Sequence, residues 1–272
     1  MTPFRRFSVA FALAGVLALV APIGALASSL ITISGATASY PLVNALAQRY
    51  SKLEHGKVRF RVTQGGTTVG INDVAAGRVN IGDVSRDPLT SDPPGLDFYP
   101  IAKYALCVVT NSSNHLGNLT TSQVQNIFTG KWTSWSEVPG ASATGKIDII
   151  GRTSTAGTLT NFQTLLMEGK KVTTSDTQES SEGLQRQGIK SDPNAIGWLS
   201  NYQALTLGGV NVVSYNGVAC SIANAKSGSY AGVARFYEVT RGRATGASKA
   251  FISWIDHSKT ANKLISTEWL PI

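Results

Sequence analysis

The sequence predicts an α/β fold with room for two lobes, and three observations lead to this prediction. Along the chain, apolar segments with the period of a strand alternate with apolar segments that have the period of a helix, which is the pattern of α/β proteins. Small residues form several of the turns between these strands and helices. The 272-residue chain is also long enough to bury two medium-sized hydrophobic cores after an N-terminal segment is removed.

The N-terminal segment, residues 1–27, is typical of a secretory signal peptide. A pair of arginines is followed by an uncharged, mostly apolar core over residues 7–25 and by a small-residue cleavage site before Ser28. A membrane anchor is the competing interpretation, but a proline and a glycine interrupt the apolar core. No cysteine follows this core directly, so a lipid anchor is not expected. We expect cleavage near Ala27-Ser28 and a mature protein that is periplasmic or secreted.

The first part of the mature chain contains three predicted strands. The second of them alternates apolar side chains with lysine and arginine, and the first and second are each followed by a turn of small residues and a predicted helix. Pro41 falls in the first turn of the first helix, where no backbone hydrogen bond is lost. The predicted strands cover residues 30–34, 57–63 and 79–86.

The rest of the chain repeats this arrangement of strand, turn and helix. Residues 152–158 form a small-residue turn between a predicted strand and a helix that carries Leu159 and Phe162. No solenoid-type repeat and no low-complexity tail interrupts the pattern. Strands are predicted at 104–111, 147–151, 195–199 and 210–215, and helices near 122–128, 247–255 and 260–265.

Three of the small-residue turns have the composition of an oxyanion site. Each connects a strand to the start of a helix, where unpaired backbone N–H groups and the helix dipole attract an anion. Ordinary helix capping explains a single turn of this kind better. Three such turns together with an arginine favour binding of a tetrahedral oxyanion without a metal. The candidate donors are the hydroxyl groups of Thr37, Thr67 and Thr158, the N–H groups of Ala38 and Gly157, and the guanidinium of Arg152.

The charged and polar residues exclude several other functions. The signal segment contains two arginines and no acid, so its removal lowers the formal net charge from +8 to +6. A basic balance of this size favours an anionic partner, and because the basic residues are scattered we expect no nucleic acid. The three histidines lie far apart, and neither a Gly-x-Ser-x-Gly motif nor another catalytic set is present. We therefore expect no metal, no cofactor and no enzymatic activity.

The two cysteines, Cys107 and Cys220, leave two alternatives open. Export permits a disulfide bond between them. Cys107 also lies in an apolar segment, where a buried free thiol fits equally well. The sequence favours neither alternative over the other.

Six motifs of the chain resemble those of the PstS-type phosphate-binding proteins, the periplasmic receptors of ABC transporters, in the same order and over essentially the whole mature length. They are residues 35–41, 64–71, 79–86, 119–131, 152–158 and 195–198. The resemblance implies a two-lobed periplasmic-binding-protein-like fold of type II, in which each lobe is a central β-sheet flanked by helices and the ligand lies in the cleft between them. It implies a first lobe of residues 28–103 and 236–272 and a second lobe of residues 104–235.

The resemblance also implies a function and a set of ligands. An exported protein of this kind captures inorganic phosphate, or a similar tetrahedral oxyanion, and delivers it to the membrane permease subunits of an ABC importer. A monomer is expected. Carried over position by position, the implied phosphate ligands are Thr37, Ala38, Thr67, Ser85, Arg86, Arg152, Ala156, Gly157 and Thr158.

Two positions depart from the usual pattern of this family. Ala156 stands where the family usually has a serine, so one hydroxyl donor is lost unless Thr155 replaces it. Ser85 stands where the best-known high-affinity members place an aspartate, with Asp83 nearby. Discrimination among phosphate, sulfate, arsenate and molybdate is therefore open. Two other functions are open as well: an exported phosphoester hydrolase that uses the same site, and a phosphate-binding sensor or surface protein without a transporter.

Overall fold

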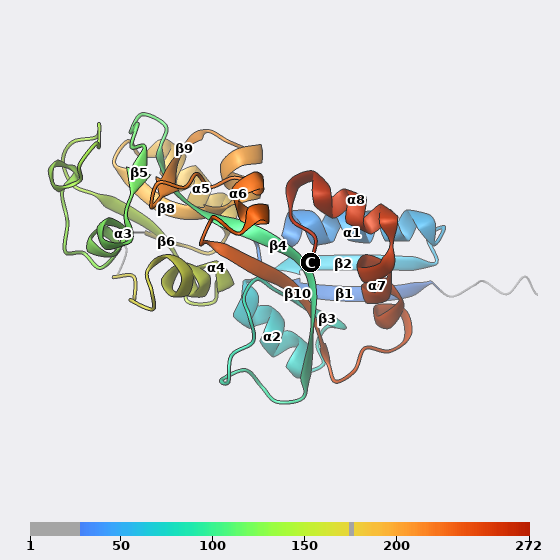
Figure 1. Cartoon of the computed structure of the whole chain (residues 1–272). Coiled ribbons are helices and arrows are strands. Elements are labelled where there is room, and N and C mark those ends of the chain that lie inside the picture. The colour runs from blue at the N-terminus through green and yellow to red at the C-terminus, as the bar shows by residue number, and fades with distance from the viewer. Residues whose placement is uncertain (1–27, 174–176) are drawn as a thin grey trace, which may run out of the picture.

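The computed structural model describes residues 28–173 and 177–272, and the predicted signal peptide lies outside the described residues. A curled, mixed β-sheet runs through the molecule, and helices cover it in two groups, one on each half of the sheet (Figure 1). This arrangement confirms the predicted α/β fold with two lobes.

The first half is built on three parallel strands in the order that the sequence predicts. The strands are β1 (Ser29–Gly35), β2 (Val58–Gln64) and β3 (Ile81–Val84), and the helices between them are α1 (Tyr40–Leu53) and α2 (Thr67–Ala75). β1 lies between the other two strands and pairs with both. Two helices from the end of the chain, α7 (Gly246–His257) and α8 (Lys259–Glu268), complete this half (Figure 1).

The second half contains the middle of the chain. Its strands are β5 (Asn118–Leu119), β6 (Asp148–Arg152), β7 (Thr177–Glu179), β8 (Ala195–Ser200) and β9 (Val210–Tyr215). Its α-helices are α3 (Thr121–Phe128), α4 (Gly157–Asn161), α5 (Glu182–Ser191) and α6 (Ile222–Ser227). A 3-10 turn at Trp135–Glu137 and π-helical turns at Phe162–Leu166 and Tyr202–Thr206 complete it.

Two long strands join the halves. β4 (Leu96–Asn111) has 16 residues, and β10 (Val233–Arg241) pairs with its first part in an antiparallel manner. From Leu106 onward, β4 pairs instead with β8 and β9 of the second half, while β10 pairs with β3 of the first. The resulting strand order is β2-β1-β3-β10-β4-β8-β6-β7. β4 therefore belongs to both halves, as the central green strand of Figure 1 shows.

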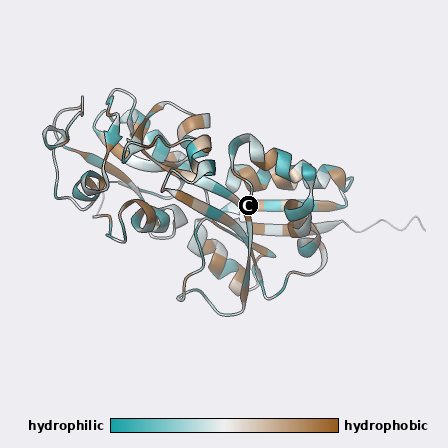
Figure 2. Cartoon of the chain, in the orientation of Figure 1, coloured by the Kyte–Doolittle hydropathy of each residue, from teal (hydrophilic) through white to brown (hydrophobic). Residues whose placement is uncertain are grey.

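Buried hydrophobic side chains form a core that extends through both halves. Where the long strands cross, the ring of Tyr104 on β4 stacks on that of Phe236 on β10, with ring centroids 4.2 Å apart. In the second half, Phe162 stacks on Trp198 at 4.3 Å. Hydrophobic and hydrophilic segments alternate along the helices in Figure 2, as expected for helices with one side against the core.

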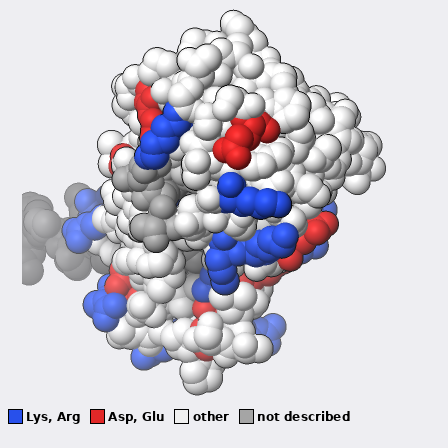
Figure 3. Space-filling view, turned by 90° about the vertical axis from the view of Figure 1, so that its left-hand side faces the viewer, with Lys and Arg blue, Asp and Glu red and all other residues white. Residues whose placement is uncertain are grey.

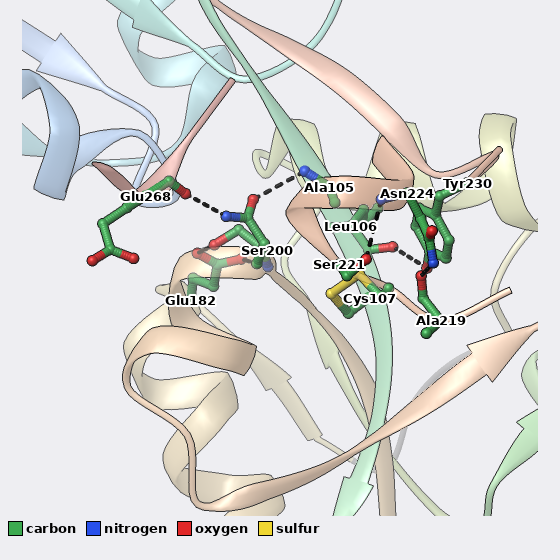
Figure 4. The surroundings of a disulfide bond; sticks show 12 residues. Ala105, Leu106, Cys107, Glu182, Ser200, Ala219, Ser221, Asn224, Tyr230 and Glu268 are labelled. Atoms are coloured by element: carbon green, nitrogen blue, oxygen red, sulfur yellow. Dashed lines mark hydrogen bonds between the residues drawn. A yellow bond between two sulfur atoms is a disulfide. The ribbon is translucent and has the colours of Figure 1, made fainter. Parts of the chain in front are cut away.

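Of the two alternatives for the cysteines, the structure shows the disulfide. Cys107 on β4 is bonded to Cys220, which lies just before α6 (Figure 4). Close by, the Tyr230 hydroxyl donates a hydrogen bond to the carbonyl oxygen of Leu106 at 2.8 Å. The disulfide therefore ties the segment that precedes α6 to the strand shared by both halves.

Removal of this disulfide is expected to lower the free energy of unfolding by about 2–5 kcal/mol. The two cysteines are 113 residues apart in sequence, so loss of the bond frees a long loop and raises the entropy of the unfolded chain. Urea denaturation of the Cys107→Ala, Cys220→Ala double variant measures the effect, with chemically reduced wild-type protein as the control. An unchanged urea midpoint contradicts this expectation.

Candidate anion-binding site

A small cavity lies where the two halves of the molecule meet. Because β1, β2 and β3 are parallel neighbours, their carboxyl ends share one edge of the sheet, and the turn after β6 meets this edge from the second half. The empty space between the lining atoms is small, about 140 Å³ including its opening. It is lined by Ala36, Thr37, Ala38, Gly66, Thr67, Ser85, Arg152, Ala156, Gly157 and Thr158.

The turn that follows β1 is held by backbone hydrogen bonds to both neighbouring strands. The Ala36 N–H donates to the carbonyl oxygen of Asp83 at 2.9 Å, and the N–H groups of Gly65 and Gly66 donate to that of Gly35 at 2.9 and 2.8 Å. Gly35 has a φ of +151°, and a side chain there would meet the Asp83 carbonyl oxygen at 1.9 Å. Glycine is therefore required at this point, and the turn is fixed against the cavity.

Two buried hydroxyl groups of the first half lie side by side at the cavity. Thr67 is the first residue of α2 and Ser85 follows β3; their hydroxyl oxygens are 3.0 Å apart. The Ser85 N–H also donates to the Thr67 hydroxyl at 3.1 Å. Because a hydroxyl group both donates and accepts, this pair can offer a ligand either a hydrogen or a lone pair.

Among the lining residues, Arg152 at the end of β6 is the one charged side chain. Its Nη2 donates to the Thr37 hydroxyl at 3.0 Å and its Nη1 to the Thr158 hydroxyl at 3.3 Å, so the guanidinium contacts both halves. Its Nε donates to the carbonyl oxygen of Glu179 at 3.0 Å. Burial lowers the pKa of Arg152, and the nearby Glu182 acts against this shift. A buried and oriented guanidinium is well suited to bidentate contact with an oxyanion.

The start of α4 brings the second half into contact with the first. A side chain at Gly157 would lie 2.6 Å from the hydroxyl oxygens of both Ser85 and Thr67, so glycine permits the close approach. Beside it, the N–H of Thr68 donates to the carbonyl oxygen of Thr155 at 3.1 Å. The two halves are thus closed around the cavity.

The structure brings eight of the nine predicted site residues together in the lining of this cavity: Thr37, Ala38, Thr67, Ser85, Arg152, Ala156, Gly157 and Thr158. Ala36 and Gly66 also line it and were not predicted, although they belong to the same turns. Thr155 does not line the cavity and does not replace the hydroxyl that is missing at Ala156. Its hydroxyl oxygen lies 3.1 Å from that of Thr153 instead.

The ninth predicted residue, Arg86, is not brought to the cavity. Its Nη1 and Nη2 donate to the two carboxylate oxygens of Asp92 at 2.9 and 2.6 Å. Burial raises the pKa of Asp92, but the bonds from Arg86 and from the Leu89 N–H outweigh this effect and hold the pKa below its ordinary value. The guanidinium of Arg86 is therefore engaged in a buried ion pair at the side of the site.

Two residues that no sequence motif indicated support the site from outside its lining. Asn161, the last residue of α4, donates through Nδ2 to the carbonyl oxygen of Ser85 at 2.7 Å and to the Tyr104 hydroxyl at 2.9 Å. The Tyr104 hydroxyl donates to the same Ser85 carbonyl at 2.9 Å. Burial raises the pKa of Tyr104, so the phenol stays protonated. These bonds join α4 of the second half to the strand end that carries Ser85.

Other kinds of chemistry find little support in the described part of the chain. No carboxylate, imidazole or thiol lines the cavity, and within residues 28–173 and 177–272 no group of three or more His, Cys, Asp or Glu side chains could hold a metal ion.

Among these described residues, no helix has both the length and the apolar character needed to cross a membrane. On the face in Figure 3, basic and acidic side chains are interspersed on a mostly uncharged surface.

The fold and the cavity together define a class of protein. Two α/β lobes, joined by crossing strands, enclose a small space lined by hydrogen-bond donors and one buried cation, which is the architecture of a protein that binds a solute between its lobes. The family model of the PBP superfamily domain matches residues 21–257, and the chain belongs to this superfamily.

Individual relatives show which members of this superfamily the chain resembles. The phosphate-binding protein PstS of Bacillus subtilis (strain 168) is 28% identical over 252 residues, which are 90% of this chain and 82% of that relative. The structure of a putative phosphate ABC transporter substrate-binding protein with bound phosphate from Clostridium perfringens is 25% identical, with a TM-score of 0.83 over 90% of this chain and 100% of that one. An ABC-type phosphate transport receptor from Vibrio cholerae, 24% identical, shares the fold with a TM-score of 0.72 over 89% of this chain and 100% of its own. The resemblance to PstS-type proteins is confirmed.

Proposed function

We propose that this protein is exported, captures inorganic phosphate in the cavity between its lobes and delivers it to an ABC importer. The observation that carries the proposal is the set of groups around the cavity: one buried guanidinium and hydroxyl groups from both lobes, with no acid in the lining. Such a set binds an oxyanion through its charge and through hydrogen bonds. The sequence and structural relatives, which are phosphate-binding proteins by name, support phosphate as the anion.

The proposed ligands come from both lobes. Arg152 now donates to the hydroxyl groups of Thr37 and Thr158, and a bound anion takes these donors over in part. The Thr67 and Ser85 hydroxyl pair can accept the hydrogen of hydrogen phosphate, which sulfate lacks. This pair therefore supplies a physical basis for discrimination in place of a cleft aspartate. The proposed ligand set is Thr37, Ala38, Thr67, Ser85, Arg152, Ala156, Gly157 and Thr158.

Capture requires that the lobes open and close. We assign residues 28–103 and 236–272 to the first lobe and residues 104–235 to the second, so that β4 and β10 cross between the lobes at the hinge. An anion that contacts both lobes binds the closed form more tightly than the open form and shifts the equilibrium toward closure. The closed form is the one that permease subunits recognise, and the protein performs no chemistry on its ligand.

Isothermal titration calorimetry with an anion panel tests the proposed function. We expect micromolar or tighter binding of phosphate and much weaker binding of sulfate and molybdate. Heat with sulfate or molybdate and none with phosphate overturns the choice of anion but leaves the site intact. Turnover of a chromogenic phosphate ester that survives repurification and is lost in Thr67→Ala overturns the binding-protein function in favour of a hydrolase.

The Asn161→Ala variant is expected to bind phosphate roughly tenfold more weakly, because a hydrogen bond between the lobes that exists only in the closed form is lost. Asn161 does not line the cavity, so the anion keeps its own contacts. Calorimetry measures the Kd, and small-angle X-ray scattering measures how much phosphate is needed for compaction. Asn224→Ala is the matched control, since Asn224 bonds to Ala219 within one lobe. Equal affinities of both variants and the wild type contradict this role.

A further inference from the structure

Two carboxyl groups are buried side by side behind the proposed phosphate site. Asp83 on β3 and Glu238 on β10 are directly opposite each other in the antiparallel register. Residues that face each other in this way have Cβ atoms about 4.5–5.5 Å apart on the same face of the sheet. Asp83 is 2% exposed and Glu238 is 0% exposed, so water does not solvate either charge.

Among the described residues, neither carboxyl group has a cationic partner. Both oxygens of Asp83 accept a bond from the Ser39 hydroxyl at 2.6 Å, whereas both oxygens of Glu238 are buried without a hydrogen-bond partner among the described residues. Asp83 is the charged group whose field acts on Glu238. The other charged or titratable side chains on the described elements packed around the pair make no hydrogen bond to it. They are Tyr40, Arg49, Tyr50 and Lys52 on α1, Asp73 on α2, Asp97, Tyr99, Lys103 and Tyr104 on β4, and Arg235, Tyr237 and Arg241 on β10.

Several of these neighbouring groups are engaged elsewhere. Asp73 accepts bonds from Ser34 and Arg78. The Tyr99 hydroxyl, although Tyr99 is opposite Glu238 in the register with β4, accepts the N–H of Ala244 at 2.9 Å. The cation Arg235 pairs with Asp87 at 3.5 Å, and no ion pair among the described residues involves Asp83 or Glu238.

Two adjacent buried carboxylates cannot both be ionised at low energy, because each charge is desolvated and repels the other. A proton held between them removes one charge and gives the oxygens of Glu238 the donor that they lack. We propose that Asp83 and Glu238 form a buried proton-binding site, and that phosphate capture is coupled to the occupancy of this site by a proton. The second part rests on the proposed function.

The pKa values of both carboxyl groups are shifted in the direction expected for a pair that holds a proton. Burial raises the pKa of Asp83 to about 7, while the bond from Ser39 acts against the rise. Burial, together with the charge of Asp83, raises the pKa of Glu238 well above its ordinary value. The two groups titrate as a pair, with apparent pKa values that belong to both. The pair therefore gains or loses a proton near neutral pH.

The position of Asp83 links the pair to the cavity. Its carbonyl oxygen accepts the N–H of Ala36, its carboxylate accepts a bond from the Ser39 hydroxyl, and Ser85 follows it by two residues, just after the end of β3. Ala36 and Ser85 both line the cavity. A negative charge on the pair repels an anion through a protein interior that screens poorly, so phosphate binds better when the proton is present. Phosphate binding should therefore take up protons at a pH at which the pair is partly ionised.

Calorimetry in buffers of different ionisation enthalpy measures the protons taken up on phosphate binding between pH 6 and 9. Phosphate itself titrates in this range, so the wild type is compared with the double variant Asp83→Asn, Glu238→Gln, in which both titrating groups are absent. We expect the wild-type Kd to rise more steeply with pH than the Kd of the double variant, by up to about tenfold more per pH unit for one proton. Identical pH slopes in the two proteins overturn the coupling.

A second measurement without phosphate keeps the proton site separate from the proposed function. The pKa values of Asp83 and Glu238 are higher in the folded protein than in the unfolded chain, where they are about 4. The stability that the protonated pair contributes is therefore fully present below about pH 4. It is lost as the pH rises through the folded pKa of Asp83, about 7. We expect the Tm advantage of Glu238→Gln over the wild type to widen from pH 5 to pH 9. Asp256→Asn, which removes a carboxylate with 67% exposure on α7, is the control. An advantage that does not grow with pH overturns the proton site, whereas failure of all proteins to bind phosphate overturns only the proposed function.

Discussion

Replacement of Arg152 by alanine is expected to weaken phosphate binding at least about 100-fold. The guanidinium is the one charged group in the cavity lining. Hydrogen bonds to charged groups contribute about 1.5–3 kcal/mol each, and about 1.4 kcal/mol corresponds to a factor of ten in affinity. Loss of the two bonds of a bidentate contact therefore lowers the affinity by at least two factors of ten. Arg152→Lys keeps the charge but not the planar fork, and an intermediate loss is expected. Calorimetric titration with phosphate gives the Kd of each variant.

The matched control for Arg152 is Arg59→Ala, which removes the same charge from an exposed position on β2. Its affinity should stay within about twofold of the wild type, because the exposed charge is screened by solvent. Glu182 loses a favourable charge in Arg152→Ala, so a cooperative unfolding transition of that variant is recorded first. A folded Arg152→Ala protein with nearly wild-type affinity would show that the anion binds elsewhere.

The Gly157→Val variant is expected to lose about 10- to 100-fold in phosphate affinity, because overpacking of this kind costs about 1–3 kcal/mol. The added Cβ alone would lie 2.6 Å from the hydroxyl oxygens of Ser85 and Thr67. The lobes must move apart to relieve this contact, which separates the two sets of anion donors. Calorimetry measures the loss, and small-angle X-ray scattering should show a protein that stays expanded when phosphate is added.

Gly117→Val is the matched control for this change. A Cβ at Gly117 meets no atom within 4 Å, so the same added side chain leaves the lobes free to close. Compaction of Gly157→Val by phosphate at the wild-type concentration would refute the role of this glycine in closure.

The donors of the site could be predicted because each belongs to a local sequence pattern. Small residues between a strand and a helix indicate a helix start with available N–H groups, and neighbouring parallel strands bring such turns to one edge of a sheet. For this reason Thr37, Thr67 and Thr158 could be named from the sequence although they are far apart along the chain. The periodicity of the first three strands and two helices is equally local.

Elements with an interrupted pattern were not predicted. β10 carries Arg235 and Glu238 among apolar residues, and its register against β4 shifts between Phe236 and Tyr237, so its side chains do not alternate regularly. β4 begins at Leu96, well before the predicted start at residue 104, because its first part is less apolar. α5 was also missed, since it is polar and contains two glycines.

The unpredicted features of the site depend on contacts between distant segments. Nothing in the sequence around Arg86 indicates that Asp92 takes both of its terminal nitrogens. The contact of Asn161 with Ser85 spans 76 positions. Burial of Glu238 opposite Asp83 likewise follows from the pairing of distant strands. The local sequence alone predicts that a glutamate lies at the surface.

The strand that both lobes share also sets an order of events during folding. β3 and the first part of β4 lie on either side of β10, which begins only at Val233, and α7 and α8 come later still. The first lobe therefore cannot complete its sheet until almost the whole polypeptide is available. Pairing over such long stretches of chain is slow compared with local helix formation. For the export proposed above, this delay is an advantage, because a polypeptide threaded through a membrane pore must not become compact while the rest of it is still in transit.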